Sequence, residues 1–594
     1  MTPDLHASAI APDTSGMNFY RDDHAVDDLL SLYLPAALHG HLRPHLDELG
    51  RAAAAELDEA SRLADRHPPQ LHHRDRFGRD LQWIEYHAAY RQLEEAAFGR
   101  YGLHAMSHRE GVLGWPQRFP TVAKHAFTLL FNEAEFGLGC PINVTDSAAH
   151  LIAQFGTEAI RARFLPRMLT QDMAQHWQGA QFMTEKEGGS DVGESTTWAV
   201  RDAVLPSDAT GERYLLHGEK WFCSNADAEV ATLLARPEGA PAGNAGLALF
   251  VMPRLLEDGT PNHFRIMRLK DKLGTRSMAS GEIRLDGAVA YPLGELSSGL
   301  KQMMSMVNWS RLSNGIKSAA LMRRAVLDAW QVMRHRKVFG QSLTALPLAV
   351  RQMLKVQLPA EQALSMGFFT ADALDRAEGP GAARGDNNAR AVVRLATPVL
   401  KFRATRDARK VAGDALEIRG GCGYVEDFVN ARLLRDAHLG SIWEGTSNVV
   451  AIDALRRAVG RHGCLAAYIA ALQSRLDAAS TAPTLLRSRA ATALHLASDL
   501  AERTVAGRHE HHFRQAASAL YHASSAALMV WEGALLAETR GDAWRWLWAR
   551  LVLDEKLAVR DPLSPEGDGD REQRMLDLLQ APADAATVAA LIAE

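Results

Sequence analysis

Cysteine is scarce in this sequence, and long apolar runs are missing. The four cysteines are scattered over 594 residues and none forms a CxxC pair, so the sequence indicates neither a disulfide framework nor a zinc site. No uncharged apolar run reaches the roughly 18 residues of a membrane-spanning helix. The N-terminus, MTPDLHASAIAPDTSG, also lacks the basic and then apolar pattern of a secretory signal. We therefore expect a protein of the reducing cytoplasm without a membrane span.

An excess of positive charge is missing as well. The chain has 66 Lys and Arg against 71 Asp and Glu, a formal net charge of −5, so no global positive field attracts nucleic acid or an anionic membrane. Residues 461–594 contain 14 Lys and Arg against 17 Asp and Glu, the wrong sign for attraction to phosphates. Binding of DNA through this region is therefore disfavoured, although a local basic patch stays compatible with these totals.

Apolar residues, in contrast, are plentiful. They make up 47% of a chain that is too long for a single core. Leucines at three- and four-residue spacing predict helices, whereas short alternating runs such as AGLALFVMPR predict strands. We expect an α+β multidomain protein with five parts: an N-terminal arm (1–24), a helical domain (25–180), a middle β domain (181–296), a helical bundle (297–460) and a helical extension (461–594). The segment EGPGAARGDNN (378–388) is expected to be a loop.

The stretch SIWEGTSNVV (441–450) places a glutamate in a turn. Thr446 or Ser447 is a good N-cap for the following run VVAIDALRRAV, so the turn should lead into a helix. Trp443 could exclude water from Glu444 and raise its pKa, which suits a base that takes a weakly acidic proton. Taken on its own, the stretch favours a glutamate that does no more than complete the turn.

Four further stretches could contact a ligand, although each has an ordinary structural explanation. MTEKEGGSD (183–191) is a glycine-rich turn through which backbone N–H groups can approach a flat or anionic group. In GEKWFCSN (218–225), strand alternation sends Phe222 and Ser224 to one face, where they could cover an aromatic ring or simply pack. RKVFG (336–340) and RGGCGY (419–424) offer a guanidinium and backbone amides that suit a pyrophosphate.

In this order and on this layout, the five stretches resemble the acyl-CoA dehydrogenase superfamily over about residues 25–460. The resemblance is closest to the AidB-like branch, which is named for an adaptive-response protein and is isovaleryl-CoA-dehydrogenase-like. MTEKEGGSD carries Lys186 where typical members have proline, and WFCS, RLKDKLGTRSMAS and SIWEGTSN also point to this branch. The implied fold is an N-terminal helical domain, a β-barrel-like middle domain and a C-terminal four-helix bundle, here followed by a helical extension.

The resemblance also implies roles for individual residues. Glu444 matches the catalytic base, and Ser190 and Arg311 match positions near the substrate, although Asn308 stands where many members have an acidic residue. Typical members have tryptophan and threonine where this chain has Phe222 and Ser224. The positions that match FAD contacts are Met183, Thr184, Gly189, Ser190, Phe222, Ser224, Arg336, Phe339, Gly420, Gly421, Trp443, Gly445, Thr446 and Asn448.

The implied reaction is α,β-dehydrogenation of an acyl-CoA thioester to a trans-2-enoyl thioester. In it the base removes the α-proton, a hydride leaves the β-carbon for flavin N5, and the backbone N–H of Glu444 with a flavin ribityl hydroxyl polarises the carbonyl. The resemblance implies a role in fatty-acid or amino-acid catabolism, an electron-transfer flavoprotein as acceptor, and a homo-oligomer of at least two subunits, with a dimer of dimers expected. Two alternatives stay open: a flavin oxidase, and an AidB-like protein with a DNA-binding or alkylation-response role and weak dehydrogenase activity.

Two features of the extension could concern a metal or a membrane. His509 and His512 in RHEHHF stand at helical spacing, but no third ligand is evident, so we expect a solvated histidine-rich face and no metal. The tryptophans of DAWRWLWAR (Trp544, Trp546, Trp548) are expected to pack between domains or subunits, with membrane contact as the lesser alternative.

Overall fold

The computed structural model describes residues 10–379, 386–565 and 567–594. Most of the loop predicted at 378–388 and the first nine residues of the predicted arm lie outside this part of the chain. The chain divides into two compact units. We call them the helical unit (Met1–Ala55, Pro120–Glu133 and Asn314–Glu594) and the mixed unit (Glu56–Phe119 and Ala134–Ser313).

The mixed unit is built around a seven-stranded sheet. Its order is β10-β11-β7-β4-β8-β3, and β9 joins β8 to β11, so the pairings close into a ring. Strands β3 and β4 run parallel to β8, and the other pairings are antiparallel. The ring confirms the predicted barrel-like domain. The strands are β3 (Gly179–Phe182), β4 (Trp198–Arg201), β7 (Tyr214–Ser224), β8 (Val230–Pro237), β9 (Ala248–Pro253), β10 (Phe264–Leu269) and β11 (Ser280–Pro292).

Apolar side chains fill both the interior of this ring and one side of it. Leu216, Phe250 and Ile283 meet inside one buried cluster, while Leu151 and Phe164 pack against Leu249 in a second cluster. Because β9 contributes to both clusters, all six of its residues are buried. The covering helices are α6 (Gly139–Phe155) and α7 (Glu158–Met168), and the unit also contains α3 (Glu56–Arg66) and α4 (Ala88–Glu94), which continues as a π-helix over Glu95–Arg100.

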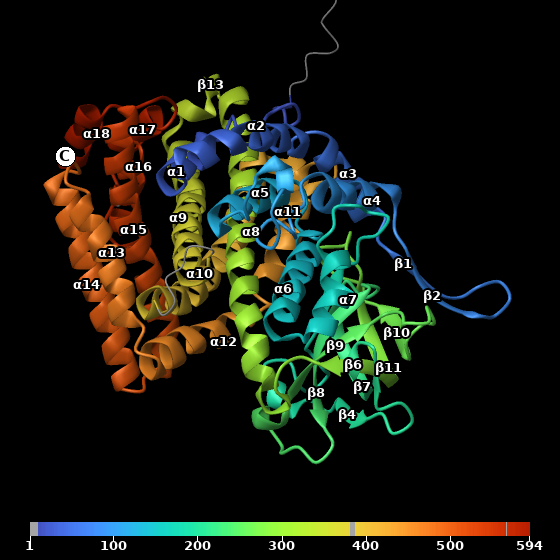
Figure 1. Ribbon diagram of the computed structural model, residues 1–594. Coiled ribbons are helices and arrows are strands. Elements are labelled where there is room, and N and C mark those ends of the chain that lie inside the picture. The colour runs from blue at the N-terminus through green and yellow to red at the C-terminus, as the bar shows by residue number, and fades with distance from the viewer. Residues whose placement is uncertain (1–9, 380–385, 566) are drawn as a thin grey trace, which may run out of the picture. The chain divides into compact units, whose positions relative to one another are not determined.

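A hairpin interrupts the region in which a mostly helical pattern was predicted. It consists of β1 (Gln70–Arg74) and β2 (Asp80–Glu85) (Figure 1). Its turn is held by the Asp75 carboxylate, which accepts hydrogen bonds from the backbone N–H groups of Phe77 (2.8 Å) and Arg79 (2.9 Å). An Asx-type turn of this kind provides the reversal that separates two short strands from the helices around them.

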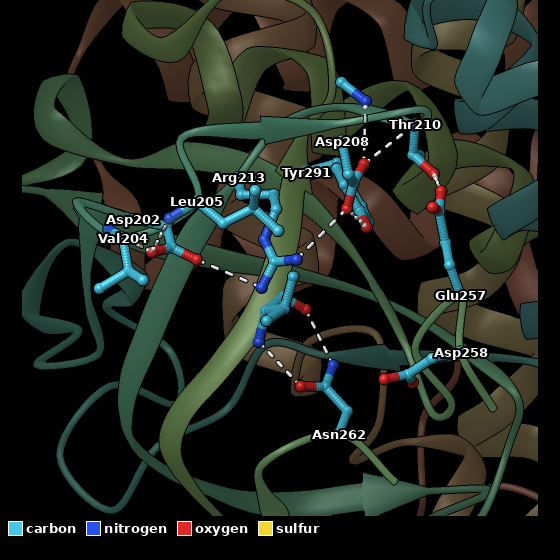
Figure 2. A network of polar contacts seen from close by, with 12 residues as sticks. Asp202, Val204, Leu205, Asp208, Thr210, Arg213, Glu257, Asp258, Asn262 and Tyr291 are labelled. Atoms are coloured by element: carbon cyan, nitrogen blue, oxygen red, sulfur yellow. Dashed lines mark hydrogen bonds and ion pairs between the residues drawn. The ribbon is translucent and has the colours of Figure 1, made fainter. Parts of the chain in front are cut away.

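Polar contacts fix the connections at one end of the barrel (Figure 2). The Arg213 guanidinium lies between Asp202 (3.2 Å) and Asp208 (3.6 Å), and the Tyr291 hydroxyl donates to Asp208 (2.7 Å). Burial together with this hydrogen bond raises the pKa of Tyr291 to about 12. Asp208 belongs to β5 (Ser207–Asp208), which pairs with β6 (Gly211–Glu212), so the network ties this small hairpin to β11. We assign it a structural role.

The helical unit contains a set of long helices. Helix α8 (Gly299–His335) begins in the mixed unit and continues into this one, and α9 (Pro347–Glu378) lies beside α10 (Asn387–Arg419). Between α8 and α9 stands a hairpin with two residues in each strand, β12 (Lys337–Val338) and β13 (Gln341–Ser342). The remaining helices before the extension are α1 (His24–Tyr33), α2 (Ala36–Ala53), α5 (Thr121–Ala134), α11 (Val429–Gly440) and α12 (Ser447–Ile452), continued as a π-helix over Asp453–Arg461.

The extension packs onto the same unit. Its helices are α13 (Leu465–Ala478), α14 (Thr484–Ala506), α15 (Phe513–Arg540), α16 (Arg545–Val552), α17 (Gly569–Leu578) and α18 (Ala585–Ala593). Helix α15 contacts α9, α13, α14 and α16, and α13 to α16 lie side by side in orange to red in Figure 1. Trp544, Trp546 and Trp548 are at most 4% exposed, so they pack within the chain, which contradicts the alternative of membrane contact.

One buried arginine joins the extension to the bundle. Arg545 is 0% exposed, and its guanidinium lies between the carboxylates of Glu361 in α9 (2.6 Å) and Glu532 in α15 (2.7 Å). Burial of these charged groups is tolerated because they compensate one another, together with the buried Arg323 guanidinium 3.5 Å from Glu361. Among the described helices, none is both long and apolar enough to cross a membrane.

Candidate active site

The predicted site residues fall into two sets, one in each unit. The set in the helical unit comprises Arg336, Phe339, Gly420, Gly421, Trp443, Glu444, Gly445, Thr446 and Asn448. The set in the mixed unit comprises Met183, Thr184, Gly189, Ser190, Phe222, Ser224 and Arg311.

Glu444 lies in a strained turn between two helices. Helix α11 ends at Gly440 and α12 begins at Ser447, with Thr446 as the N-cap residue, which confirms the predicted turn before a helix. Glu444 has φ +56° and Gly445 has φ +97°. The left-handed region costs a non-glycine residue about 1–3 kcal/mol, so it persists only where the surroundings impose it. The backbone of the half-buried Glu444 is therefore held in one specific conformation.

Two buried lysines contact the residues on either side of Glu444. The Lys401 ammonium, from α10, donates to the carbonyl of Gly445, and the Lys317 ammonium, from α8, lies 4.4 Å from the Trp443 ring centroid. Lys401 is 0% exposed and Lys317 is 2% exposed. A charged hydrogen bond contributes about 1.5–3 kcal/mol and a desolvated cation–π contact about 2 kcal/mol, so both contacts favour the observed conformation of the turn.

Neither lysine is among the predicted site residues. The available signal was a lysine inside an apolar helical stretch, as in TPVLKF and NGIKSAA. A lysine in such a stretch points into the core only when its ammonium has a polar or aromatic partner in the core. The partner here is a turn more than forty residues further along the chain, which no local pattern reveals.

The turn between β12 and β13 displays Phe339. Phe339 (φ +53°) and Gly340 (φ +80°) occupy its two central positions, the arrangement of a type I′ hairpin turn. The Phe339 side chain is 94% exposed. A large apolar ring presented in this way is available to a ligand or to another chain.

Arg336 lies beside the glycine turn within the helical unit. Nη1 of Arg336 is 3.5 Å from the carbonyl oxygen of Arg419. At Gly420 φ is +72°, and a Cβ built there would be 3.2 Å from Nη1 of Arg336. Around Gly421 a Cβ would meet open space. A planar guanidinium beside a turn without side chains is a suitable donor set for a pyrophosphate.

In the mixed unit, the glycine-rich loop is fixed to the barrel at its start. The backbone N–H of Trp221 in β7 donates to the carbonyl of Thr184 (2.8 Å). The next residue, Glu185, is 4% exposed and accepts hydrogen bonds from the hydroxyl of Thr197 and from Lys220, both at 2.6 Å. Further along the loop, a Cβ built at Gly189 would come no nearer than 3.8 Å to another atom, the Thr184 methyl group. The loop is thus anchored at its start and open at Gly189, whereas Gly188 is buried beside Ser195.

Glu185 belongs to the predicted motif, but its role as the anchor was not predicted. Burial alone would raise its pKa, but the Lys220 ammonium and the hydrogen bonds from Thr197 and Thr196 lower the pKa of Glu185 to about 2. The carboxylate is therefore ionised at neutral pH and keeps the loop on β7 and on the start of β4.

Phe222 and Ser224 lie outside the barrel on either side of buried Cys223. The pairing of β7 with β11 shifts between Lys220 and Cys223, which places a bulge at Trp221 and Phe222. Bulges re-aim side chains, and the Phe222 ring is 59% exposed. The Lys270 ammonium lies 4.8 Å from its centroid. An open aromatic face followed by a hydroxyl can cover and hydrogen-bond a planar ring system.

Two predicted residues lie deeper in the mixed unit. The Gln181 side chain donates to the sulfur of Met183 at 2.8 Å, directly after β3. Arg311 is 4% exposed in α8, and its neighbour Ser310 accepts a hydrogen bond from Asn143 (2.8 Å).

The histidines of the extension lie on a turn rather than along a helix. His509 precedes the 3₁₀ turn Glu510–His512, and all of these residues are exposed. Within the described residues, no group of three or more His, Cys, Asp or Glu side chains is placed to hold a metal ion.

Three family models match this chain. Residues 10–174 match the adaptive response protein AidB N-terminal domain, residues 180–288 the acyl-CoA dehydrogenase middle domain, and residues 297–460 the acyl-CoA dehydrogenase C-terminal domain. The strained turn and the Arg336–Gly420 pair lie in the last of these.

Similar proteins and structures point to the same family as these family models. Acyl-CoA dehydrogenase family member 11 of Caenorhabditis elegans is 32% identical over 459 residues, covering 76% of this chain and 72% of that protein. The putative acyl-CoA dehydrogenase AidB of Escherichia coli is 33% identical over 420 residues, covering 69% of this chain and 72% of its own length. The crystal structure of C. elegans ACDH-11 in complex with C11-CoA has a TM-score of 0.83 at 27% identity, over 92% of this chain and 93% of that one. The chain belongs to the acyl-CoA dehydrogenase family, with an N-terminal region of the AidB type.

Proposed function

We propose that this protein is a FAD-dependent acyl-CoA dehydrogenase that converts an acyl-CoA thioester to the trans-2-enoyl thioester. The observation that carries the proposal is Glu444, held by two buried lysines in a strained turn within the region that matches the family's C-terminal domain. A base must point in one direction to take a proton from a bound substrate. The C11-CoA complex of the C. elegans neighbour supports an acyl-CoA as substrate.

Each unit contains residues that fit a part of FAD. Arg336 and the Gly420–Gly421 turn would hold its pyrophosphate, and Phe339 would contact the adenine. Phe222, Ser224 and the loop residues Met183, Thr184, Gly189 and Ser190 would cover the ring system. Trp443, Gly445, Thr446 and Asn448, which lie in or just after the turn of the base, would contact the cofactor again. When bound, the flavin accepts the hydride that leaves the β-carbon of the substrate.

The protein's own part of the reaction centres on the turn of Glu444. Its carboxylate removes the α-proton, while its backbone N–H donates to the thioester carbonyl and stabilises the negative charge that develops there. The Trp443 indole excludes water from the carboxylate. Ser190 and Arg311 are proposed to lie along the substrate.

We propose further that an electron-transfer flavoprotein takes the electrons and that the enzyme is a cytoplasmic homo-oligomer, a dimer of dimers. Arg336 and Phe339 would then complete the FAD site of a neighbouring subunit. The exposure of the Phe339 ring, 94%, supports such a contact.

Anaerobic titration with a panel of acyl-CoAs tests the proposal. We expect the purified protein to be yellow, and its flavin absorbance to bleach with the wild type but not with Glu444→Gln. Retained FAD in Glu444→Gln is the control for an intact cofactor site. If no acyl-CoA bleaches the wild type, the dehydrogenase assignment is wrong, and oxygen consumption without an added acceptor would replace it with an oxidase.

A further inference from the structure

The residues before and after Glu444 are each held by a different helix. Lys317 of α8 contacts the ring of Trp443, and Lys401 of α10 donates to the carbonyl of Gly445. A third contact lies just upstream, where the Asn314 side chain donates to the carbonyl of Gly440 (3.0 Å). The turn is therefore fixed at its start, before the glutamate and after it.

Simple packing does not account for lysine at these two positions. Lysine is among the residues least often buried, because its ammonium loses hydration unless a partner replaces it. Here each ammonium contacts the peptide group or ring adjacent to one residue, Glu444, whose φ of +56° requires outside support. Two buried cations that converge on one strained residue point to its orientation as their role.

We propose that Lys317 and Lys401 are positioning residues for the Glu444 base. They hold the turn in the left-handed conformation that aims the carboxylate, and they act through the turn rather than on the substrate. The inference rests on the proposed function, since it concerns the same base, but the state of the turn can be measured independently of catalysis.

The test compares Lys401→Met with Lys410→Met. Both changes keep the approximate length of the side chain and remove its charge from α10, but the Lys410 side chain is 74% exposed and pairs with Asp414 on the surface. By stopped flow we expect the rate of flavin reduction at saturating acyl-CoA to fall about 100-fold in Lys401→Met, because a small misplacement of a reacting group has an effect of this size. The Kd of the acyl-CoA should change less than about 3-fold, since the lysine does not act on the substrate.

Hydrogen exchange supplies a readout without substrate. The backbone N–H groups of Ile442 and Trp443 both donate to the carbonyl of Leu439 (2.8 and 3.2 Å), so their exchange reports on the turn. Exchange over 441–446 should be faster in Lys401→Met than in the wild type and unchanged in Lys410→Met. Lys317→Met should have the same effect as Lys401→Met, whereas Lys317→Arg should stay near the wild type, because arginine also makes cation–π contacts.

The outcomes separate the positioning role from the proposed function. Unchanged reduction rate and unchanged exchange in Lys401→Met and Lys317→Met would overturn the positioning role. If no acyl-CoA reduces the wild type, the proposed function fails, and exchange still decides whether the lysines hold the turn. If Lys401→Met does not fold, the pair Lys317→Met and Lys317→Arg decides the question by the same two measurements.

Discussion

A single carboxylate, Glu185, fastens the glycine-rich loop to the barrel, and its removal should be strongly destabilising. Glu185→Gln leaves the Lys220 ammonium, which is 0% exposed, without its anionic partner. Breaking a buried pair from one side costs about 3–5 kcal/mol. We expect a loss of about 3 kcal/mol in the free energy of unfolding, measured with urea. Glu187→Gln, two residues away and exposed in the same loop, is the control and should change it by less than about 0.5 kcal/mol.

The same residue predicts a pH dependence. Because the pKa of Glu185 is lowered from 4.5 to about 2 in the folded protein, its contribution to stability is complete above pH 4.5 and is lost as the pH falls toward 2. Over this window the free energy of unfolding should fall more steeply with decreasing pH in the wild type than in Glu185→Gln. Parallel pH profiles for the two proteins would contradict the lowered pKa.

A substitution at a second single residue, Gly420, tests the proposed contact of the glycine turn with FAD. In Gly420→Ala the new methyl group would lie 3.2 Å from Nη1 of Arg336, so the guanidinium must shift by a few tenths of an ångström, and φ +72° strains the backbone of the alanine. We expect the affinity for FAD to fall at least about 10-fold, since 1.4 kcal/mol of lost interaction suffices. The measurement is the ratio of flavin to protein absorbance after dialysis. Gly413→Ala in α10, where the nearest atom is 3.9 Å away, should retain FAD. Equal retention in both would exclude contact between this turn and the cofactor.

How far the sequence predicts the site can be seen at individual residues. The turn that carries Glu444 is predictable because a turn before a helix has a local signature, and the helix does begin at Ser447; the role of Glu444 as a base comes from the resemblance and remains a prediction. Lys317 and Lys401 are not, because their partner is brought to them by the packing of α8 and α10, which has no local signature. The roles that the resemblance gives to Phe222 and Arg336 remain predictions.

At the scale of the elements, helix α16 is joined to its neighbours by one buried side chain, Arg545. Arg545→Met removes the cation between Glu361 and Glu532 and so leaves both buried carboxylates undercompensated. We expect a loss of about 3–5 kcal/mol in the free energy of unfolding. A double variant, Arg545→Met with Glu532→Met, should recover part of it, because apolar replacement of buried ion pairs is tolerated better than their interruption.

The free energy of unfolding of these variants is measured with a denaturant and compared with that of the wild type. Arg503→Met, exposed in the last turn of α14, is the control. If Arg545→Met proves no less stable than Arg503→Met, the arginine does not hold the extension. Helix α16 would then rely on its buried Trp546 and Trp548 instead.

The hairpin β1–β2 shows why one element escaped prediction. Its strands are five and six residues long, and they lie between helices whose leucine spacing dominates the surrounding sequence. The strand signal of the middle domain is stronger, because several alternating runs follow one another. The order of helical and β regions is therefore predictable, whereas an isolated short hairpin is not.

For the whole molecule, the charge balance leads to a prediction about nucleic acid. With a net charge of −5, we expect no gel shift of a duplex of about 30 base pairs at near-physiological salt. A shift that weakens steeply with salt would instead favour the DNA-binding alternative. The same gel with a basic DNA-binding protein is the control for duplex quality.

The late position of Arg545 in the chain determines when, during synthesis, its ion pair with Glu361 can form. Its partner Glu361 lies 184 residues earlier in the chain, so a ribosome working at about 5–20 residues per second synthesises that carboxylate roughly 10–40 seconds before the arginine exists. During this interval Arg323, 3.5 Å from Glu361 in the finished protein, is a cation already made. The charges buried in the bundle therefore reach their final balance only when α16 leaves the ribosome.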